Sequence, residues 1–233
     1  MALIQVVSGV YQVTLGFVNV FLIDCDGLTL IDTGISTSAG KILRAVAELG
    51  RKPADIRHIL ITHLHQDHVG SLKELKTVSG AETWMHTADA ALLSAGSTIR
   101  QVQPGPGLLN WLVLRAMSTR PQDNKTEPFE VDHRLNGGET IPAAGGIRAI
   151  HVPGHTAGSL AFLWEQQGGV CFLGDSSANF VRLTYSFIYE NLEQGRASLK
   201  MLGGLSFNTA CFSHGKTIQP NAAAQILARF SSD

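Results

Sequence analysis

The sequence has few cysteines and no surplus of charge of either sign. Its 233 residues include 3 cysteines, and 18 Lys and Arg residues stand against 19 Asp and Glu residues. A disulfide framework needs more cysteines and an oxidising compartment, so we expect Cys25, Cys171 and Cys211 to be reduced, buried thiols. The balanced charge gives no positive field to attract a phosphate backbone, which argues against a nucleic-acid partner.

Long apolar runs are also missing. The apolar run at residues 108–114 is far shorter than the ~20 residues that a membrane-spanning helix requires. The first twenty residues contain no Lys or Arg, and polar residues interrupt each apolar stretch, so no secretory signal is visible. We therefore expect a cytoplasmic protein with no membrane span.

The rest of the composition is typical of a globular domain. Hydrophobic residues make up 44% of the chain and charged residues 16%, which provides enough apolar surface to offset the entropy lost on folding. The length predicts a single domain over residues 1–233. Within it, residues 94–128 form a long connection that contains an apolar, helix-like run from Leu108 to Met117. We expect this connection to be a lid over a site or an interface, for example in a homodimer.

Strand-like and helix-like segments follow a similar order in two halves of the chain. The first half has β-rich runs at residues 10–15, 19–24, 28–32 and 58–62, and helical patterns at 38–50 and 69–76. The second half has β-rich runs at 147–152, 160–165 and 170–173, and helical patterns at 192–202 and 221–230. Two such halves predict two sheets packed face to face, with helices outside.

The segment THLHQDH (residues 62–68) carries the strongest chemical signal. It places three imidazoles and a carboxylate within six residues. His63 and His65 are two positions apart in an extended segment, so they can project to one side as ligands of one metal. Asp67 and His68 fall at the expected start of a helix, where they can face a second metal. This density of donors favours a metal centre over an ordinary polar loop.

Three shorter segments each place one donor beside glycine at the expected end of a strand. These are PGHTAGS with His155, LGD with Asp175 and SHG with His214. Taken singly, each is also ordinary turn or capping chemistry. Together with THLHQDH they provide seven nitrogen and oxygen donors, a set that suits zinc, iron or manganese.

These four motifs, in this order, resemble the metallo-β-lactamase superfamily from about Val10 to His214. The resemblance implies an α+β fold, the four-layer αββα sandwich. It also implies two divalent metal ions, typically zinc. One would be bound by His63, His65 and His155, the other by Asp67, His68 and His214, with Asp175 bridging them. LIDTG (residues 30–34) resembles an early family motif in which the aspartate, here Asp32, supports the ligands without binding metal.

Such a centre predicts a hydrolase. Two cations roughly 3.5 to 4 Å apart can share a water and lower its pKa from about 15.7 towards ~7. Asp175 would act by holding both metals, and Asp67 is the candidate for passing a proton to the leaving group. We therefore expect metal-dependent hydrolysis of a small substrate.

The family's branches narrow the substrate. True β-lactamases generally have cysteine or serine at the place of Asp175, so aspartate favours an ester, thioester or lactone. Glyoxalase II enzymes share the ligands but append a glutathione-binding region, whereas about 19 residues follow His214 here. Quorum-signal lactonases tend to have tyrosine just after the bridging aspartate, whereas this chain has Ser176, Ser177 and Ala178.

Other functions also remain compatible with these motifs. Persulfide dioxygenases have similar motifs and use one iron, so iron content and oxygen uptake would identify one. A β-lactamase, a phosphodiesterase and a catalytically silent partner-binding protein are further alternatives on this fold. We expect structural or surface roles for the remaining histidines, which are His58, His86, His133 and His151. Four aromatic residues after Asp175 either line the pocket or pack in the core; they are Phe180, Tyr185, Phe187 and Tyr189.

Overall fold

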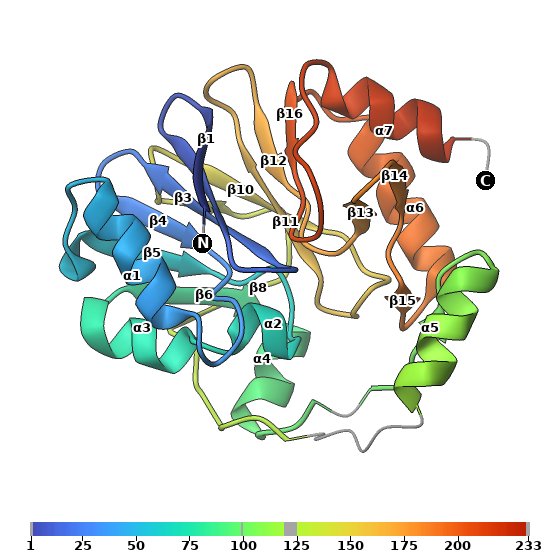
Figure 1. The fold of residues 1–233 in the computed structure, drawn as a ribbon, viewed down its shortest axis with the longest axis horizontal. Coiled ribbons are helices and arrows are strands. Elements are labelled where there is room, and N and C mark those ends of the chain that lie inside the picture. Colours follow the sequence, from blue (N-terminus) through green and yellow to red (C-terminus); the bar gives the residue numbers. More distant parts are fainter. Residues whose placement is uncertain (1, 99, 119–124, 232–233) are drawn as a thin grey trace.

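Two facing sheets organise the computed structural model, which describes residues 2–98, 100–118 and 125–231 (Figure 1). The first sheet has, in spatial order, β1 (Ala2–Val7), β2 (Val10–Thr14), β3 (Asn19–Asp24), β4 (Leu28–Ile31), β5 (Ile56–Leu60), β6 (Glu82–His86) and β8 (His133–Leu135). Neighbouring strands from β1 to β4 are antiparallel, and those from β4 to β8 are parallel. Parallel strands end at the same edge, so β4 and β5 deliver their following loops to one end of the sheet.

The second sheet belongs to the other half of the chain. Its spatial order is β16 (Thr209–Cys211), β12 (Val170–Phe172), β11 (Leu160–Trp164), β10 (Ile147–His151) and β9 (Thr140–Ile141). All of its neighbouring strands are antiparallel except β12 and β16. Two small ribbons complete the β-structure: β13 (Ser177–Asn179) with β14 (Leu183–Tyr185), and β7 (Gln103–Pro104) with β15 (Ile188–Tyr189).

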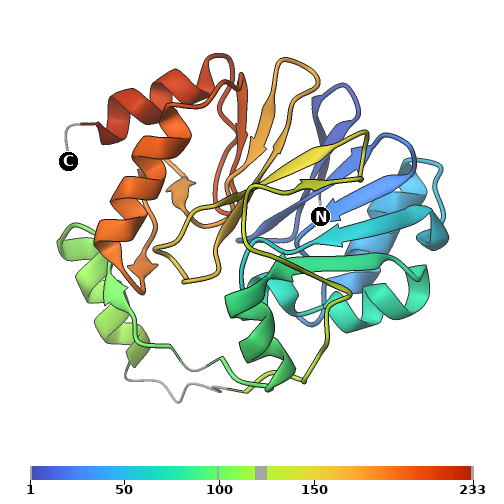
Figure 2. The same cartoon turned by 180° about the vertical axis from the view of Figure 1, so that it is seen from behind.

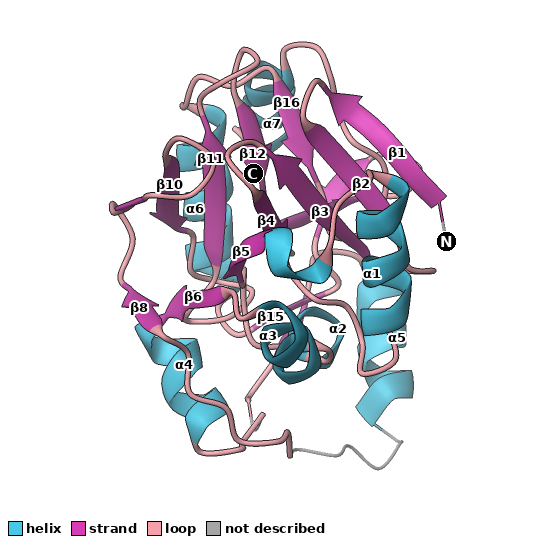
Figure 3. Ribbon diagram, turned by 90° about the vertical axis from the view of Figure 1, so that its left-hand side faces the viewer, coloured by secondary structure: helices cyan, strands magenta, loops and turns pink. Residues whose placement is uncertain are grey.

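Helices cover the outer faces of both sheets. Helices α1 (Ala39–Glu48), α3 (Leu72–Ser79) and α4 (Thr87–Ser94) lie on the side of the first sheet, and α6 (Leu192–Gly203) and α7 (Ala222–Phe230) on the side of the second (Figures 1 and 2). Short elements are α2 (Gln66–Val69) and the 3₁₀ turn Pro53–Asp55. Figure 3 shows the strands in the middle of the molecule with helices around them.

Three clusters of buried side chains fill the spaces between these layers. Alternate residues of β3 contribute to two of them: Val20 and Leu22 join the cluster with α1, whereas Phe21 and Ile23 join the cluster between the sheets. The third cluster joins the second sheet to α6 and α7, with Leu163 among its members. Each fully buried side chain of this kind stabilises the fold by about 1.5–3 kcal/mol. Three such interfaces require four layers, so the predicted αββα sandwich is confirmed.

Most predicted elements agree with the observed bounds to within two residues. The helix expected at residues 69–76 is instead two helices, α2 and α3. The break is at Gly70, where a Cβ would lie 2.4 Å from the backbone nitrogen of Ser36, so glycine allows a close approach of two loops. Strands β1, β6, β8 and β9, the two small ribbons and helix α4 were not predicted.

The long connection contains a helix at the expected place. Helix α5 (Leu108–Ser118) matches the predicted apolar run, while residue 99 and residues 119–124 lie outside the described part. Among the described helices, none is long and apolar enough to cross a membrane. All three cysteines are free thiols; Cys171 and Cys211 are buried, whereas Cys25 is only half-buried, contrary to expectation.

Candidate metal centre

All seven predicted donors meet at one end of the sandwich. They form two groups, and within each group one candidate ligand atom per residue lies within 4.8 Å of all the others. The first group is His63, His65, His155 and Asp175; the second is Asp67, His68 and His214. They come from the segments that follow β5, β10, β12 and β16; Asp67 and His68 lie in the short helix α2 and the other five in loops. The family resemblance implied the same division for the other six donors and a bridging place for Asp175, which the geometry groups with the first three histidines.

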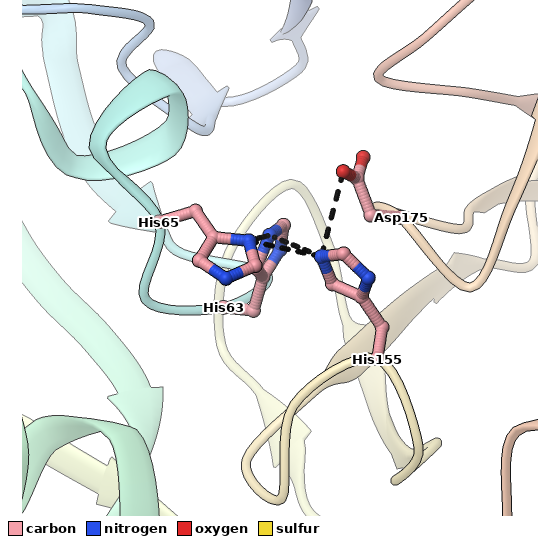
Figure 4. Close-up of side chains that lie close together, drawn as sticks. All are labelled: His63, His65, His155 and Asp175. Atoms are coloured by element: carbon pink, nitrogen blue, oxygen red, sulfur yellow. Dashed lines mark hydrogen bonds and ion pairs between the residues drawn. The ribbon is translucent and has the colours of Figure 1, made fainter. Parts of the chain in front are cut away.

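The three histidines of the first group converge on one point (Figure 4). The Nε2 atom of His155 lies 3.2 Å from Nε2 of His63 and 2.9 Å from Nδ1 of His65, and the latter two atoms are 3.0 Å apart. In a tetrahedral zinc site with Zn–N bonds of about 2.0–2.1 Å, ligand nitrogens are separated by roughly 3.3 Å. The three nitrogens are therefore close to the spacing of ligands around a shared cation.

For two of these rings, those of His63 and His155, a hydrogen bond on the opposite nitrogen aims the lone pair of Nε2 at that point. Nδ1 of His155 donates to the carbonyl of Ile188 at 2.9 Å. Nδ1 of His63 lies 3.0 Å from Oγ1 of Thr62, which itself donates to Asp32, so the imidazole is the donor to Thr62. A neutral imidazole has one N–H, so Nε2 of each ring is left as an acceptor. Burial, together with neighbouring imidazoles, lowers the pKa of His63 and His65, and burial lowers that of His155, which favours these unprotonated ligand forms.

The second group combines imidazoles with a carboxylate. Nε2 of His214 lies 3.3 Å from Oδ2 of Asp67 and 3.2 Å from Oδ2 of Asp175. Nδ1 of His214 donates to the carbonyl of Phe17 at 2.8 Å, so its Nε2 atom faces the group. Nε2 of His68 lies 3.7 Å from a carboxylate oxygen of each aspartate. These distances leave room for a cation among the donors.

Two buried polar atoms at this place have no hydrogen-bond partner among the described residues. They are Nε2 of His68 and Oδ1 of Asp175. A buried polar atom without a partner is costly, and native structures rarely keep one without a reason. When His68 is neutral and its Nδ1 donates to Asp32, Nε2 is an acceptor 3.7 Å from Oδ1 of Asp175, so a bound cation would satisfy both atoms at once. The donor set therefore fits a metal ion.

Electrostatics differ between the two groups. Burial raises the pKa of Asp67, but the charge of His68 and a hydrogen bond from His214 outweigh it and bring the pKa down to about 2. Burial lowers the pKa of His214, but Asp175 and Asp67 raise it to about 10. The pKa of His68 is also raised well above its ordinary value, because nearby carboxylates outweigh burial. The second group thus holds an excess of negative charge that either protons or a cation can balance.

Asp175 lies between the groups. Its Oδ2 atom is 3.5 Å from Nε2 of His155 and 3.2 Å from Nε2 of His214. Gly174, in the left-handed region with φ of 54°, directs the chain there, and a Cβ at this residue would lie 2.8 Å from Cβ of Thr62. The carboxylate is thus within reach of both groups, where the resemblance to the family implies a bridging ligand.

Asp32 is not one of the seven donors but forms hydrogen bonds that orient residues of both groups. Its Oδ2 atom accepts hydrogen bonds from Nδ1 of His68 and from Oγ1 of Thr62, each at 2.8 Å, and Oδ1 accepts the backbone N–H of Thr62 at 2.8 Å. The residue is 1% exposed and has a φ of 62°, which is uncommon outside glycine and is found at functional sites. These contacts fix the orientation of His68 directly and of His63 through Thr62.

The four aromatic residues after Asp175 divide into two pairs. Tyr185 and Tyr189 are buried in the core cluster beneath α6 and α7. The hydroxyl of Tyr189 donates to the carbonyl of Ser176 at 2.8 Å and accepts the N–H of Ser186 at 2.9 Å. Phe180 is 42% exposed, lies 6.2 Å from the ring of His214 and contacts Phe187 at 5.9 Å. Tyr185 and Tyr189 therefore pack in the core, whereas Phe180 lies beside a donor of the second group and contacts Phe187.

The remaining histidines stay outside both groups. His86 stacks on His151, and Nδ1 of His86 accepts the N–H of Ala88 at the start of α4. His133 stacks on Trp84, and His58 lies beside the same indole. Their contacts are structural, as expected.

Sequence reasoning missed two residues beside the centre. The ring of Phe17, 59% exposed, stacks on His214 with centroids 6.0 Å apart, and its only sequence signal is an aromatic residue in the Gly16 turn. Asp89 is fully buried and bonds to the loops of the first group. An acidic residue near the start of a helix is so common that no signal marked Asp89.

Comparisons with known proteins agree with this geometry. The sequence profile of the metallo-beta-lactamase superfamily matches residues 13–214. The uncharacterized protein YobT of Bacillus subtilis is 37% identical over 68% of this chain and 61% of its own length. The thioesterase pkgB of Emericella nidulans is 26% identical over 87% of this chain and 46% of its own length. The alignments thus span about half to two thirds of these relatives.

A solved structure supports the fold independently. A metallo-beta-lactamase of Cronobacter sakazakii superposes with a TM-score of 0.77 at 21% identity, covering 100% of this chain and 95% of that one. At this identity, the likeness concerns the fold alone. With the family profile, the sandwich and the two donor groups in agreement, the chain belongs to the metallo-beta-lactamase superfamily.

Proposed function

We propose that the chain is a metal-dependent hydrolase of a small ester, thioester or lactone, with two divalent cations at its centre, zinc being the expected metal. His63, His65 and His155 would hold one cation, and Asp67, His68 and His214 the other, with Asp175 reaching both. One observation carries this proposal: the buried Nε2 of His68 and Oδ1 of Asp175 lie 3.7 Å apart, beyond hydrogen-bond distance, and have no hydrogen-bond partner in the described part of the chain.

The cations and the protein would contribute different parts of the catalytic chemistry. When bound, two such cations supply a water of lowered pKa and polarisation of a carbonyl oxygen. The protein orients the donors: Asp32 fixes the tautomer of His68, and the Ile188 carbonyl fixes that of His155. Asp67 is 23% exposed in its side chain against 8% for Asp175, so a bound substrate can reach its carboxylate more easily. Asp67 is thus the better placed of the two to take a proton and pass it to a leaving group.

The surroundings of His214 support a substrate with an apolar group. The exposed rings of Phe17 and Phe180 flank its imidazole, at centroid distances of 6.0 and 6.2 Å. Each CH₂ that a substrate buries against such a surface contributes roughly 0.8 kcal/mol to binding. An acyl or aryl group therefore fits this side of the centre.

Two further observations bear on the kind of carbonyl compound. One of the matched relatives is named a thioesterase, which supports thioesters among the candidates. Lactonases tend to have a tyrosine just after the bridging aspartate, whereas here that place is taken by Ser176 and the hydroxyl of Tyr189 is engaged with Ser176 and Ser186. We therefore rank thioesters and aryl esters before lactones.

A parallel kinetic panel on the metal-loaded protein tests the proposal. The substrates are an aryl ester, an acyl thioester, S-lactoylglutathione, an acyl lactone, a chromogenic cephalosporin and a phosphodiester. We expect turnover of the esters and thioesters and little on the cephalosporin or the phosphodiester. Turnover of the cephalosporin alone, or of the phosphodiester alone, would contradict the substrate class. Oxygen uptake with one iron per chain would identify a persulfide dioxygenase instead.

A further inference from the structure

A buried carboxylate outside the two donor groups connects the loops that carry the three histidines. Asp89, in the first turn of α4, is fully buried. Its Oδ2 atom accepts the backbone N–H of Leu64 at 2.7 Å and the hydroxyl of Thr156 at 2.9 Å. Leu64 stands between His63 and His65, and Thr156 directly follows His155. One side chain therefore holds both loops of the three-histidine group.

The packing around Asp89 leaves little freedom. Its Oδ1 atom accepts the N–H of Gly158 at 3.1 Å, and a Cβ at Gly158 would lie 2.4 Å from that oxygen. Leu64 is fully buried in the core beside the first sheet. Neither loop can shift without breaking a bond to the carboxylate, so the positions of the three imidazoles depend on it.

Arg100, which belongs to the long connection at residues 94–128, forms an ion pair with this carboxylate. Its guanidinium, 5% exposed, donates to Oδ1 of Asp89 at 2.8 Å and also bonds to Glu190. Glu190 in turn accepts the N–H of Ala157 at 2.7 Å, two residues beyond His155. The loop of His155 is thereby held from both sides by carboxylates that share one arginine. A buried charge network of this kind is strongly disturbed when one member is removed.

The same connection reaches His155 by a second path. After Arg100, the chain forms β7, which pairs with β15. The carbonyl of Ile188 in β15 accepts the hydrogen bond from Nδ1 of His155. The connection therefore contacts the scaffold of the three-histidine group twice, once through Arg100 and once through β15.

We infer that Asp89 is a positioning residue of the three-histidine group and that Arg100 links the long connection to it. The inference rests on the proposed metal centre. Asp89 touches no donor atom of that centre and acts through the backbone between the ligands. Outer partners of metal ligands typically change metal affinity by about 10- to 100-fold when they are mutated, and we expect a loss in that range.

The test is a titration of the metal-free full chain with Co²⁺, followed by its visible absorption spectrum. We expect Asp89→Asn to weaken binding of the first ion by about 10- to 100-fold and to change the absorption bands that report ligand geometry. Arg100→Gln leaves the carboxylate in place and should shift affinity in the same direction by less.

Asp132→Asn is the matched control. Asp132 also accepts a backbone N–H and a hydroxyl, both from Thr83, and pairs with Lys76, but it lies away from the donor groups. We expect this variant to lower the thermal midpoint while leaving Co²⁺ affinity and spectrum unchanged.

The other outcomes would overturn either the role of Asp89 or the metal centre itself. A folded Asp89→Asn protein with the affinity and spectrum of the wild type would overturn the inference, as would an equal loss in Asp132→Asn. If Asp89→Asn does not fold, an unchanged affinity in Arg100→Gln overturns it. Wild-type protein that binds no Co²⁺ would instead overturn the metal centre itself, so the two failures are distinguishable.

Discussion

The floor of the site and its rim are built in opposite ways. We define the floor as the seven donors with Asp32, and the rim as Phe17 and Phe180, which lie beside His214, together with helix α5, the proposed lid. Floor side chains are mostly buried, and hydrogen bonds fix the ring orientations of His63, His68, His155 and His214.

Rim side chains are apolar and exposed: Leu108 is 72%, Trp111 46% and Phe17 59% accessible. The floor is thus specified by polar geometry and the rim by shape and apolar area. This difference predicts which measured quantity a mutation in each region should change. A floor mutation should affect metal binding and turnover, and a rim mutation should affect substrate affinity.

The largest effect is expected from Asp175→Ala. The variant loses the carboxylate that reaches both donor groups, and we expect kcat/KM to fall at least about 10²- to 10³-fold, as when one preorganised group of an active site is removed. Metal analysis of the same variant should show a lower content per chain, while circular dichroism stays native. Normal turnover would show that Asp175 is misassigned.

Asp32→Asn tests the hydrogen bonds that orient the ligands without binding metal. Asparagine tolerates the left-handed backbone of this residue, but its amide nitrogen cannot accept the bonds from Thr62 and His68. We expect zinc affinity to fall by about 10- to 100-fold and turnover to recover in part with excess zinc. Unchanged affinity, measured by competition with a chromophoric chelator, would argue against its supporting role.

Lowering the pH should remove the metal ion of one donor group before that of the other. In the metal-free protein the pKa values of His68 and His214 are raised, so a cation there must displace protons, and its affinity falls as pH decreases. The pKa values of the three histidines of the first group are lowered, so protons compete less. Dialysis from pH 8 to 5 should therefore remove one ion before the other. Simultaneous loss of both ions would contradict this difference.

The smallest effect is expected at the rim. Trp111→Ala should raise KM for an acyl or aryl substrate by about 3- to 10-fold, because about 1 kcal/mol of apolar contact is lost. Metal content and the free energy of unfolding should barely change, since the side chain is half exposed. If size-exclusion chromatography shows a changed oligomeric state while KM is unaltered, the connection is an interface, for example in a homodimer, and the lid hypothesis is wrong.

The same contrast explains what could be predicted from the sequence. THLHQDH groups four donors in one loop, and His155, Asp175 and His214 each follow a short strand-like run beside glycine, so local patterns sufficed. The resemblance to a known family then supplied the fold and the division of the donors into two groups.

Features that depend on tertiary packing gave no local signal. Tyr189 and Phe187 are two residues apart, yet the first is buried in the core and the second contacts the exposed ring of Phe180, because their surroundings depend on the path of β15. Asp89 looks like an ordinary acidic residue at a helix start, and only the three-dimensional structure shows which loops it joins.

The central claim is a centre with two metal ions, and elemental analysis tests it most directly. Protein purified without chelator and with transition metals in the medium should contain about two metal ions per chain, in keeping with a dinuclear site. Activity should rise in step with the second ion when metal is added back to the metal-free protein. One tightly bound ion per chain with full activity would contradict the account.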